Sequence, residues 1–489
     1  MKSGCALSVL VLASLSLCAQ PAPADTIELQ LQKITEVFAA IEREAATPVD
    51  PNIALYQGAI PGMLRTLDPH SSFFDPDQFQ QLQQMERSEQ KGFGSIVSVL
   101  PGRVIILQTL QGTPSAKAGL SAGDEIVAIN NIVLARLEFE QLVGLLGAAR
   151  QQQVALDVHR PGEGSLLRVT MSPELVNTPS VDRVFDVAPG IGYLRITSFE
   201  DPTGKLVKES IDKLGGNGLK GLVLDLRDDP GGSVQSAIET ASLFLKSNQL
   251  IFSIKGRAAK SEEVRVPKLT VPYSFPMAIL VNGKTASASE IVTGALQDHD
   301  RAIVLGEPSY GKGLVQQVYN LSSNSGLALT TAFYYTPSGR SIQKPVSEGQ
   351  LYAATVVDKG PYKTDSGRQV PGGGGIQPDE IVYPEGQTRL RLVLDASATF
   401  TNYATEFLRS HDIAEDFQVT SAILDDLQVF ANQRRIQPSL GEWSAERSWI
   451  SSRLQQEIVS LKFGVAKGDE VEMKRDPVVR RALEVMNRP

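Results

Sequence analysis

The stretch MAILVNGKTASASEIVTGALQDHDRAIVLGE, residues 277–307, contains two apolar runs on either side of a segment that begins with three closely spaced hydroxyl residues, Thr285, Ser287 and Ser289. MAILVNG and AIVLGE are typical of buried strands, and SASEIVTGALQD between them is typical of a helix. Upstream, residues 190–247 show the same alternation of strand and helix. The predicted strand IGYLRITSF is followed by the predicted helix DPTGKLVKESIDKLGG, and the strand GLVLDLR by the helix SVQSAIETASLFLKS. This order predicts a layered α/β domain with largely parallel strand pairing.

The composition is that of an ordinary globular protein with a mildly acidic surface. The chain has 489 residues, 42% of them hydrophobic and 21% charged, and its formal net charge is -8. Because domains usually hold on the order of 100 to 200 residues, we expect two to four of them. Nucleic acids and anionic lipids bind surfaces with dense clusters of lysine and arginine. The negative net charge of this chain therefore argues against both as main partners.

The first segment, MKSGCALSVLVLASLSLCAQPAPADT, is typical of an export signal. Lys2 precedes an apolar stretch that ends near Cys18 and is followed by small residues and prolines, which is too short for a stable membrane span. We expect cleavage after Ala24 and a periplasmic or otherwise exported protein. Membrane association is expected only if the segment is retained as an anchor or lipidated.

The cysteines and histidines indicate neither a metal site nor a cofactor. Cys5 and Cys18 both lie in the signal segment, so the mature chain would have no thiol for a disulfide or a nucleophile. The four histidines are scattered without metal-ligand spacing.

Residues from about 92 to 169 alternate short β-rich runs with turns and one helix near residues 137–149. The run GTPSAKAGLSAGDEIVAINN, residues 112–131, resembles the PDZ domains of exported bacterial proteases. In such domains, KGFGSIV at residues 91–97 would be the loop that holds a peptide's terminal carboxylate, through Gly92, Phe93, Gly94 and Ser95. Glycines let successive N–H groups converge on an anion, and the next strand edge can pair with the peptide. A glycine turn in another small β domain is the alternative.

The segments that flank the PDZ-like and α/β regions have other secondary-structure patterns. Apolar residues at three- and four-residue steps predict an amphipathic helix from Ile27 to Arg43, and a second helix is expected around residues 55–67. Residues 318–380 are rich in β runs and loops, and the chain beyond about Thr388 is helical without catalytic features. The fold class is therefore multidomain α+β, with a layered α/β core and helical N- and C-terminal regions.

Two strand-to-helix turns and one lysine are the candidate catalytic elements. Ser287 and Ser289 lie at or just inside a helix N-terminus, where a hydroxyl either caps the helix or is presented as a nucleophile beside free N–H groups. At the second turn, LDLRDDPGG, Gly231 and Gly232 permit the close backbone approach that an oxyanion hole requires, although a plain tight turn would also account for them. Lys312 lies between two glycines directly after a strand. Removal of water from its ammonium would favour the neutral amine, which can act as a general base.

Taken together, these motifs resemble the C-terminal processing peptidases, exported Ser/Lys proteases with an embedded PDZ domain. The resemblance covers roughly residues 30–385, through LDPHSSFF, the PDZ segment, LDLRDDPGG, TASASEIVTGALQD, GEPSYGKGLVQ, YYTPSGRSIQ and GIQPDE. It implies a signal peptide at 1–24, an N-terminal helical region at 25–85, a PDZ domain at 86–170, a protease core at 171–387 and a C-terminal helical region at 388–489.

The resemblance also implies roles for single residues. Ser287 is expected to be the nucleophile, Lys312 its base and Gln316 the residue that orients the lysine by hydrogen bonding. The N–H of Ala288 and one from Gly231 or Gly232 would hold the oxyanion. Asp229 departs from the family, which commonly has asparagine in this turn, and a carboxylate there could oppose charge development in the oxyanion hole.

Three classes of function are compatible with these features. The leading one is a serine endopeptidase that recognises unstructured protein C-termini through its PDZ domain and cleaves by an acyl-enzyme route. The second is a catalytically decayed PDZ scaffold of the cell envelope, which the joint presence of Ser287, Lys312, Gln316 and both glycines disfavours. The third is another hydrolase or acyl-transfer enzyme on the same fold, which the PDZ segment disfavours.

Overall fold

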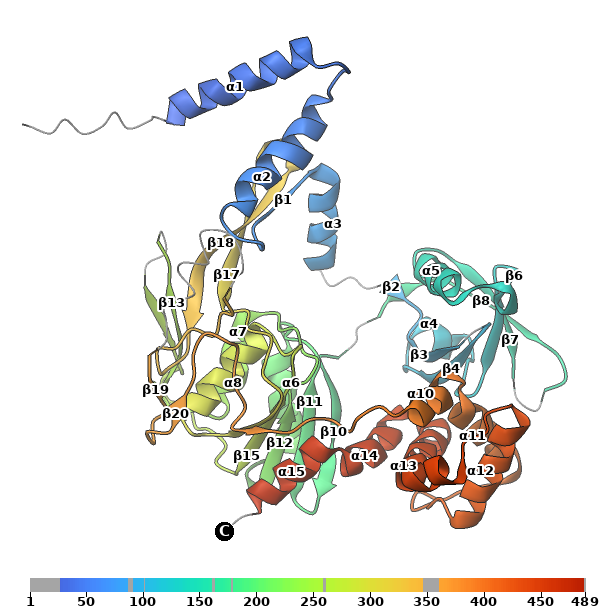
Figure 1. Ribbon diagram of the computed structural model, residues 1–489. Helices are drawn as coiled ribbons and strands as arrows, with labels where there is room; N and C mark the ends of the chain where they lie inside the picture. Colours follow the sequence, from blue (N-terminus) through green and yellow to red (C-terminus); the bar gives the residue numbers. More distant parts are fainter. Residues whose placement is uncertain are drawn as a thin grey trace, which may run out of the picture. The chain divides into compact units, whose positions relative to one another are not determined.

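The computed structural model describes residues 27–86, 91–100, 102–160, 163–176, 179–257, 261–345 and 360–487 (Figure 1). The expected signal segment at 1–24 lies outside these ranges. The chain divides into two compact units, Met1–Met63 and Leu64–Pro489. None of the helices in the described ranges has the length and apolar character needed to cross a membrane.

The first unit is helical in its described part. Helix α1 (Ile27–Glu44) confirms the helix predicted from the apolar period, and the π-helix η1 (Ile53–Ala59) and helix α2 (Ile60–Arg65) follow. No residue of α1 is buried. Its apolar stripe therefore belongs to no core in the described structure.

A six-stranded sheet forms the centre of the second unit. Its strands in spatial order are β10 (Val181–Ala188), β11 (Ile191–Ile196), β12 (Gly221–Asp225), β15 (Met277–Val281), β16 (Ile303–Gly306) and β21 (Glu380–Ile381). Neighbours from β11 to β21 are parallel, and β10 is antiparallel to β11. The predicted layered α/β domain is thus confirmed. Because parallel strands end at one edge, the segments after β12, β15 and β16 meet there.

Helices cover both faces of this sheet (Figure 1). One face packs against α6 (Thr203–Lys213), α7 (Val234–Ser242) and α8 (Ala288–Asp298). Alternate strand residues such as Val223 and Leu280 point to the other face, where they form a core with α14 (Val465–Arg475) and α15 (Pro477–Met486). The last two helices of the chain are therefore a layer of the α/β domain, which their sequence did not indicate.

A second sheet, whose strands are interleaved in the chain with those of the parallel sheet, supplies the segment that carries Lys312. Its main path is β1 (Ser72–Phe74), β18 (Gly326–Tyr335), β13 (Leu250–Lys255) and β14 (Glu262–Arg265), and β17 (Leu314–Asn320) also pairs with β18. All these pairs are antiparallel. Gln316 lies on β17, two residues after its start, and Lys312 lies just before it.

The small β region is a separate antiparallel sheet with its own core. Its path is β3 (Ser95–Leu100), β4 (Arg103–Thr109), β5 (Glu125–Ile129), β7 (Val154–His159) and β8 (Leu167–Met171), and β6 (Ile132–Val133) pairs with β5. Helices α4 (Pro114–Lys117) and α5 (Phe139–Ala149) belong to the same region, and β2 (Lys91–Gly92) pairs with β9 (Glu174–Leu175). Strand β3 is an edge of the sheet in the described structure.

The chain after the α/β core is helical, as predicted. Four helices share one core: α10 (Arg389–Ala396), α11 (Thr399–Ser410), α12 (Ser421–Gln433) and α13 (Leu440–Phe463). The remaining short elements are α3 (Pro76–Glu86), η2 (Leu134–Arg136), η3 (Gly216–Gly218), η4 (Ser322–Asn324), β19 (Tyr362–Lys363) and β20 (Gln369–Val370).

Candidate active site

The turn between β15 and α8 and the first turn of α8 hold the hydroxyl residues Thr285, Ser287 and Ser289, which differ in burial. The Thr285 hydroxyl donates to the Leu226 carbonyl at 2.7 Å, and the Ser289 hydroxyl donates to the Asp229 carbonyl at 3.3 Å. Both side chains are fully buried, whereas Ser287 is only half-buried. Of the three, Ser287 is therefore the hydroxyl that a substrate can reach.

Ser287 is the N-cap residue of α8 and has a strained backbone. Its φ is 56° and its ψ is -114°, which a residue with a side chain rarely adopts. Such strain persists only where the surrounding structure enforces it, and it is typical of functional turns. The next residue, Ala288, is the first of the helix, so its N–H has no acceptor within the helix.

The glycine turn after β12 lies directly against the Ser287 turn. A β-carbon on Gly231 would lie 2.7 Å from the Ala286 carbonyl oxygen, 2.8 Å from the Ala288 nitrogen and 2.9 Å from the Ser287 β-carbon. A β-carbon on Gly232 would lie 2.2 Å from the Phe199 carbonyl oxygen. Both positions thus require glycine, and Gly231 and Ala288 are brought together as the oxyanion hypothesis expects.

The Gly231 N–H is nevertheless already bonded. It donates to Oδ1 of Asp229 at 2.8 Å, within the same turn. The two backbone groups proposed from sequence are adjacent, but one of them has a carboxyl oxygen as its present acceptor.

Glu290 holds the two proposed catalytic segments together. Its side chain is fully buried, and its Oε2 accepts the N–H of Ser287 at 2.8 Å and the N–H of Lys312 at 2.9 Å. Its Oε1 accepts the Gly311 N–H at 2.7 Å and the Ser309 hydroxyl. Burial raises the pKa of Glu290, and these four donors act in the opposite direction. The sequence showed a glutamate in the first helical turn but gave no sign of this shared acceptor.

The segment around His70 lies beside Lys312 and Gln316. Burial lowers the pKa of His70; the carboxylate of Asp68 opposes this, and the positive charge of Lys312 lowers the pKa further. The Gln316 amide nitrogen donates to the His70 carbonyl at 2.9 Å. Between described residues, no hydrogen bond joins Lys312 Nζ to Ser287 or to the Gln316 side chain. Catalytic hydrogen bonds often tighten only when substrate is bound, so this arrangement is compatible with a dyad.

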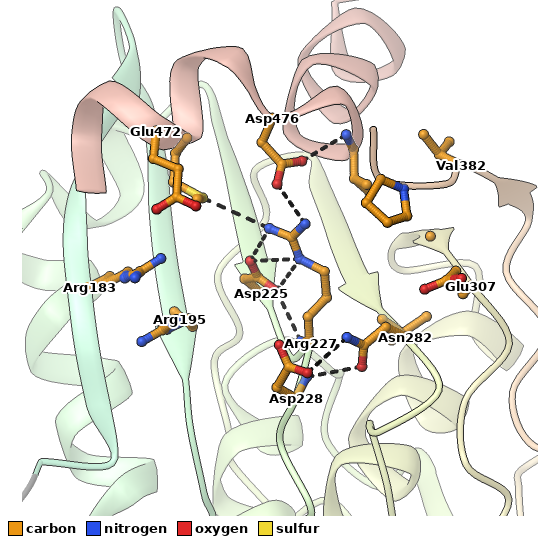
Figure 2. A pocket seen from close by; sticks show the side chains of 15 residues that line it. Arg183, Arg195, Asp225, Arg227, Asp228, Asn282, Glu307, Val382, Glu472 and Asp476 are labelled. Carbon is orange, nitrogen blue, oxygen red and sulfur yellow. Dashed lines mark hydrogen bonds and ion pairs between the residues drawn. The ribbon is translucent and has the colours of Figure 1, made fainter. Parts of the chain in front are cut away.

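A charged cavity of about 350 Å³ lies beside the same edge of the sheet (Figure 2). Arg227 lies at its centre and bonds Asp225 and, at 2.7 Å, Asp476 at the start of α15. Burial alone would lower the pKa of Arg227, but these two carboxylates raise it overall. Asp228 bonds Asn282 and forms an ion pair with Lys284. The cavity lining does not include Ser287, Lys312 or Gln316, so its charged groups are separate from the proposed reacting groups.

The predicted carboxylate loop precedes the edge strand β3. Gly94 has a φ of 72°, and a β-carbon there would lie 2.3 Å from the Thr113 side chain. The carbonyls of Gly94 and Phe93 accept the N–H groups of Leu110 and Ser115. The loop is therefore held against the start of α4, and it leads into β3, which is an edge strand among the described residues.

Comparison with known proteins places these features in one family. Residues 190–350 match the model of peptidase family S41, and residues 105–160 match a PDZ domain model. A carboxy-terminal-processing protease of Bartonella bacilliformis is 35% identical over 321 residues, covering 64% of this chain and 73% of that protein. The chain belongs to the carboxy-terminal-processing proteases of peptidase family S41.

This protease family includes bacterial and chloroplastic relatives. The carboxy-terminal processing protease CtpA of Bacillus subtilis is 30% identical over 353 residues, covering 71% of this chain and 74% of that protein. A chloroplastic carboxyl-terminal-processing peptidase of Arabidopsis thaliana is 34% identical, covering 58% of each chain. The protein is thus a serine-type peptidase with a PDZ domain, and its substrates are proteins or peptides. Ser287, Lys312 and Gln316 fall within the S41 match, whereas Gly92, Phe93, Gly94 and Ser95 precede the PDZ match.

Proposed function

We propose that the protein is an endopeptidase in which Ser287 is the nucleophile and Lys312 is its general base. Ser287 Oγ attacks the carbonyl carbon of the peptide bond while its proton passes to Lys312 Nζ. The C–N bond then breaks, and the same proton moves to the leaving amine. A water that gives its proton to Lys312 hydrolyses the ester and restores Ser287.

The observation that carries this proposal is the shared acceptor Glu290. One carboxylate oxygen bonds the backbone N–H of both Ser287 and Lys312, so the two residues are fixed beside each other although they are 25 positions apart in the chain. The burial of Thr285 and Ser289 leaves Ser287 as the accessible hydroxyl of the turn. A lysine base also needs no histidine.

The remaining site residues act around this pair. The Ala288 N–H and an N–H of the Gly231–Gly232 turn would hold the oxyanion, because Gly231 lies against the Ala288 nitrogen. Gln316 would fix the lysine side chain, and its bond to the His70 carbonyl holds its own amide in place.

We infer that the PDZ domain recognises unstructured C-termini of substrates. The edge strand β3 can pair with an extended peptide, and N–H groups of Gly92, Phe93, Gly94 and Ser95 would take the terminal carboxylate. We also propose the partition into a signal peptide at 1–24, an N-terminal region to 85, a PDZ domain to 170, a protease core to 387 and a C-terminal region. The signal segment and the chloroplastic and bacterial relatives support export to the periplasm or another compartment of the cell envelope.

The test is cleavage of an unstructured peptide with an apolar C-terminus, followed by mass spectrometry of the products. Ser287→Ala should abolish cleavage, because it removes the attacking oxygen. The matched control Ser289→Ala changes a hydroxyl two residues away and should retain turnover. If Ser289→Ala were as inactive as Ser287→Ala while still folded, the choice of nucleophile would be wrong; uncleaved peptide with wild type would favour the scaffold alternative.

A further inference from the structure

Asp229 has an unusual environment for a carboxyl group. It lies in the turn between β12 and α7, and its side chain is fully buried. Oδ1 accepts the Gly231 N–H at 2.8 Å, whereas Oδ2 has no hydrogen-bond partner among the described residues. A buried carboxylate with a single donor is costly, so the neutral acid is favoured.

Charged neighbours do not offset this cost. Burial raises the pKa of Asp229 to about 7, and the Gly231 N–H offsets only part of the effect, because the Ser289 hydroxyl donates to the Asp229 backbone carbonyl and not to its carboxyl group. Ionisable side chains on the surrounding turns and helix are engaged with other groups: Arg227 with Asp225 and Asp476, Asp228 with Lys284, Glu200 with Ser198, and Glu290 with Ser309. Lys312, on the segment after β16, acts on His70 and is not among the groups that shift Asp229.

The position of Gly231 connects this carboxyl group to the reaction. Gly231 lies against the Ala288 nitrogen and the Ser287 β-carbon, where an oxyanion would form. An ionised Asp229 would hold the Gly231 N–H in a charge-assisted bond and place a negative charge beside the developing oxyanion. A neutral Asp229 is a weaker acceptor and carries no such charge, so the same N–H can turn to the substrate.

We propose that Asp229 is a positioning residue that gates the oxyanion hole by its protonation state. When Asp229 is neutral, the Gly231 N–H can donate to the oxyanion. When Asp229 is ionised, the same N–H stays bonded to its carboxylate. This inference rests on the proposed Ser287 mechanism. Cleavage then needs the acid form of Asp229, so wild type loses activity, relative to a variant that cannot ionise at this position, as the pH rises through the Asp229 pKa.

The test is kcat/KM of wild type and Asp229→Asn on one peptide from pH 5 to 9. Asparagine keeps an oxygen for the Gly231 N–H and cannot ionise. With the carboxyl titrating near 7, its neutral fraction falls about tenfold by pH 8 and about 100-fold by pH 9. We therefore expect Asp229→Asn to match wild type at pH 5 and to exceed it by roughly those factors at pH 8 and pH 9.

Asp228→Asn is the matched control, because it makes the same chemical change one residue earlier on an exposed side chain. Its pH profile should follow that of wild type. In addition, the infrared band of a protonated carboxyl should disappear with rising pH in wild type and be missing in Asp229→Asn.

The outcomes separate this inference from the proposed mechanism. Cleavage that depends on Ser287, with the same pH profile for wild type and Asp229→Asn, would overturn the gating role alone. The lack of a titrating carboxyl band that is specific to Asp229 would also overturn it. Cleavage that survives Ser287→Ala unchanged would overturn the mechanism and the gating role together.

Discussion

Replacement of Glu290 by alanine and by glutamine would perturb the acceptor that Ser287 and Lys312 share. Alanine removes the acceptor of three backbone N–H groups, those of Ser287, Gly311 and Lys312. Glutamine keeps one oxygen, which can still accept the Ser287 and Lys312 N–H groups. Its NH2 group must then face the Gly311 N–H, so one donor is left without an acceptor.

The magnitudes follow from the number of unpaired donors. A buried N–H without an acceptor costs roughly 1–3 kcal/mol, so the alanine variant would lose roughly 3–9 kcal/mol from the local structure and the glutamine variant roughly 1–3 kcal/mol. Because about 1.4 kcal/mol corresponds to a tenfold change in rate, we expect Glu290→Gln to lose about tenfold in kcat/KM. Glu290→Ala should lose at least about 100-fold.

The assay combines peptide cleavage with hydrogen exchange of residues 309–313. Both variants should exchange faster in this segment than wild type, with alanine the more affected. Glu209→Ala is the control, because Glu209 is an exposed helical glutamate whose ion pair with Lys205 spans 3.8 Å. Wild-type cleavage and wild-type protection of 309–313 in Glu290→Ala would refute the role of Glu290 in joining the two segments.

Three further outcomes are expected. Lys312→Arg should be nearly as damaging as Lys312→Ala, because a guanidinium stays protonated and cannot accept the serine proton; turnover of the arginine variant near wild type would remove lysine from the base role. Gly94→Pro forces φ from 72° to about −65°, places side-chain atoms against Thr113 and deletes one N–H, so it should distort the loop and reduce the preference for a free-acid peptide over its amidated form; equal wild-type rates for both peptides would mean that the PDZ domain does not read the terminal carboxylate. Asp229→Asn should stabilise the fold relative to wild type by roughly 2.5 kcal/mol more at pH 8 than at pH 5, because the Asp229 pKa is raised from 3.8 to about 7 and wild type loses that much stability between these two pH values; thermal unfolding at both pH values checks this, and an equal shift at the two would contradict it.

The order of elements could be predicted because the local signals are strong. The run GLVLDLR opens with consecutive apolar residues, and strand β12, which forms from it, is buried at every residue. The glycines of the second turn were also informative, since Gly231 lies where no side chain fits. Local sequence patterns were therefore sufficient for the sheet and for the two turns that it brings together.

The long-range contacts of the site could not be predicted in the same way. Glu290 receives donors from residues 19 to 22 positions later, and nothing in its helix indicates them. Gln316 was expected to orient the lysine, and its amide nitrogen donates to the His70 carbonyl, 246 positions away. Asp476 lies in a region to which the sequence assigned no chemistry, and it bonds Arg227 next to the glycine turn. Such contacts depend on how distant segments pack.

The most direct measurement of the central claim is the site of acylation on the enzyme itself. Wild type and Ser287→Ala would be mixed with an activated peptidyl ester, quenched in acid within the first turnover and digested for mass spectrometry. The proposed mechanism predicts the acyl group on the fragment that contains Ser287, at the Ser287 oxygen, and none in Ser287→Ala. An acyl group on Ser289 or on another residue, or hydrolysis by Ser287→Ala at the wild-type rate, would contradict it.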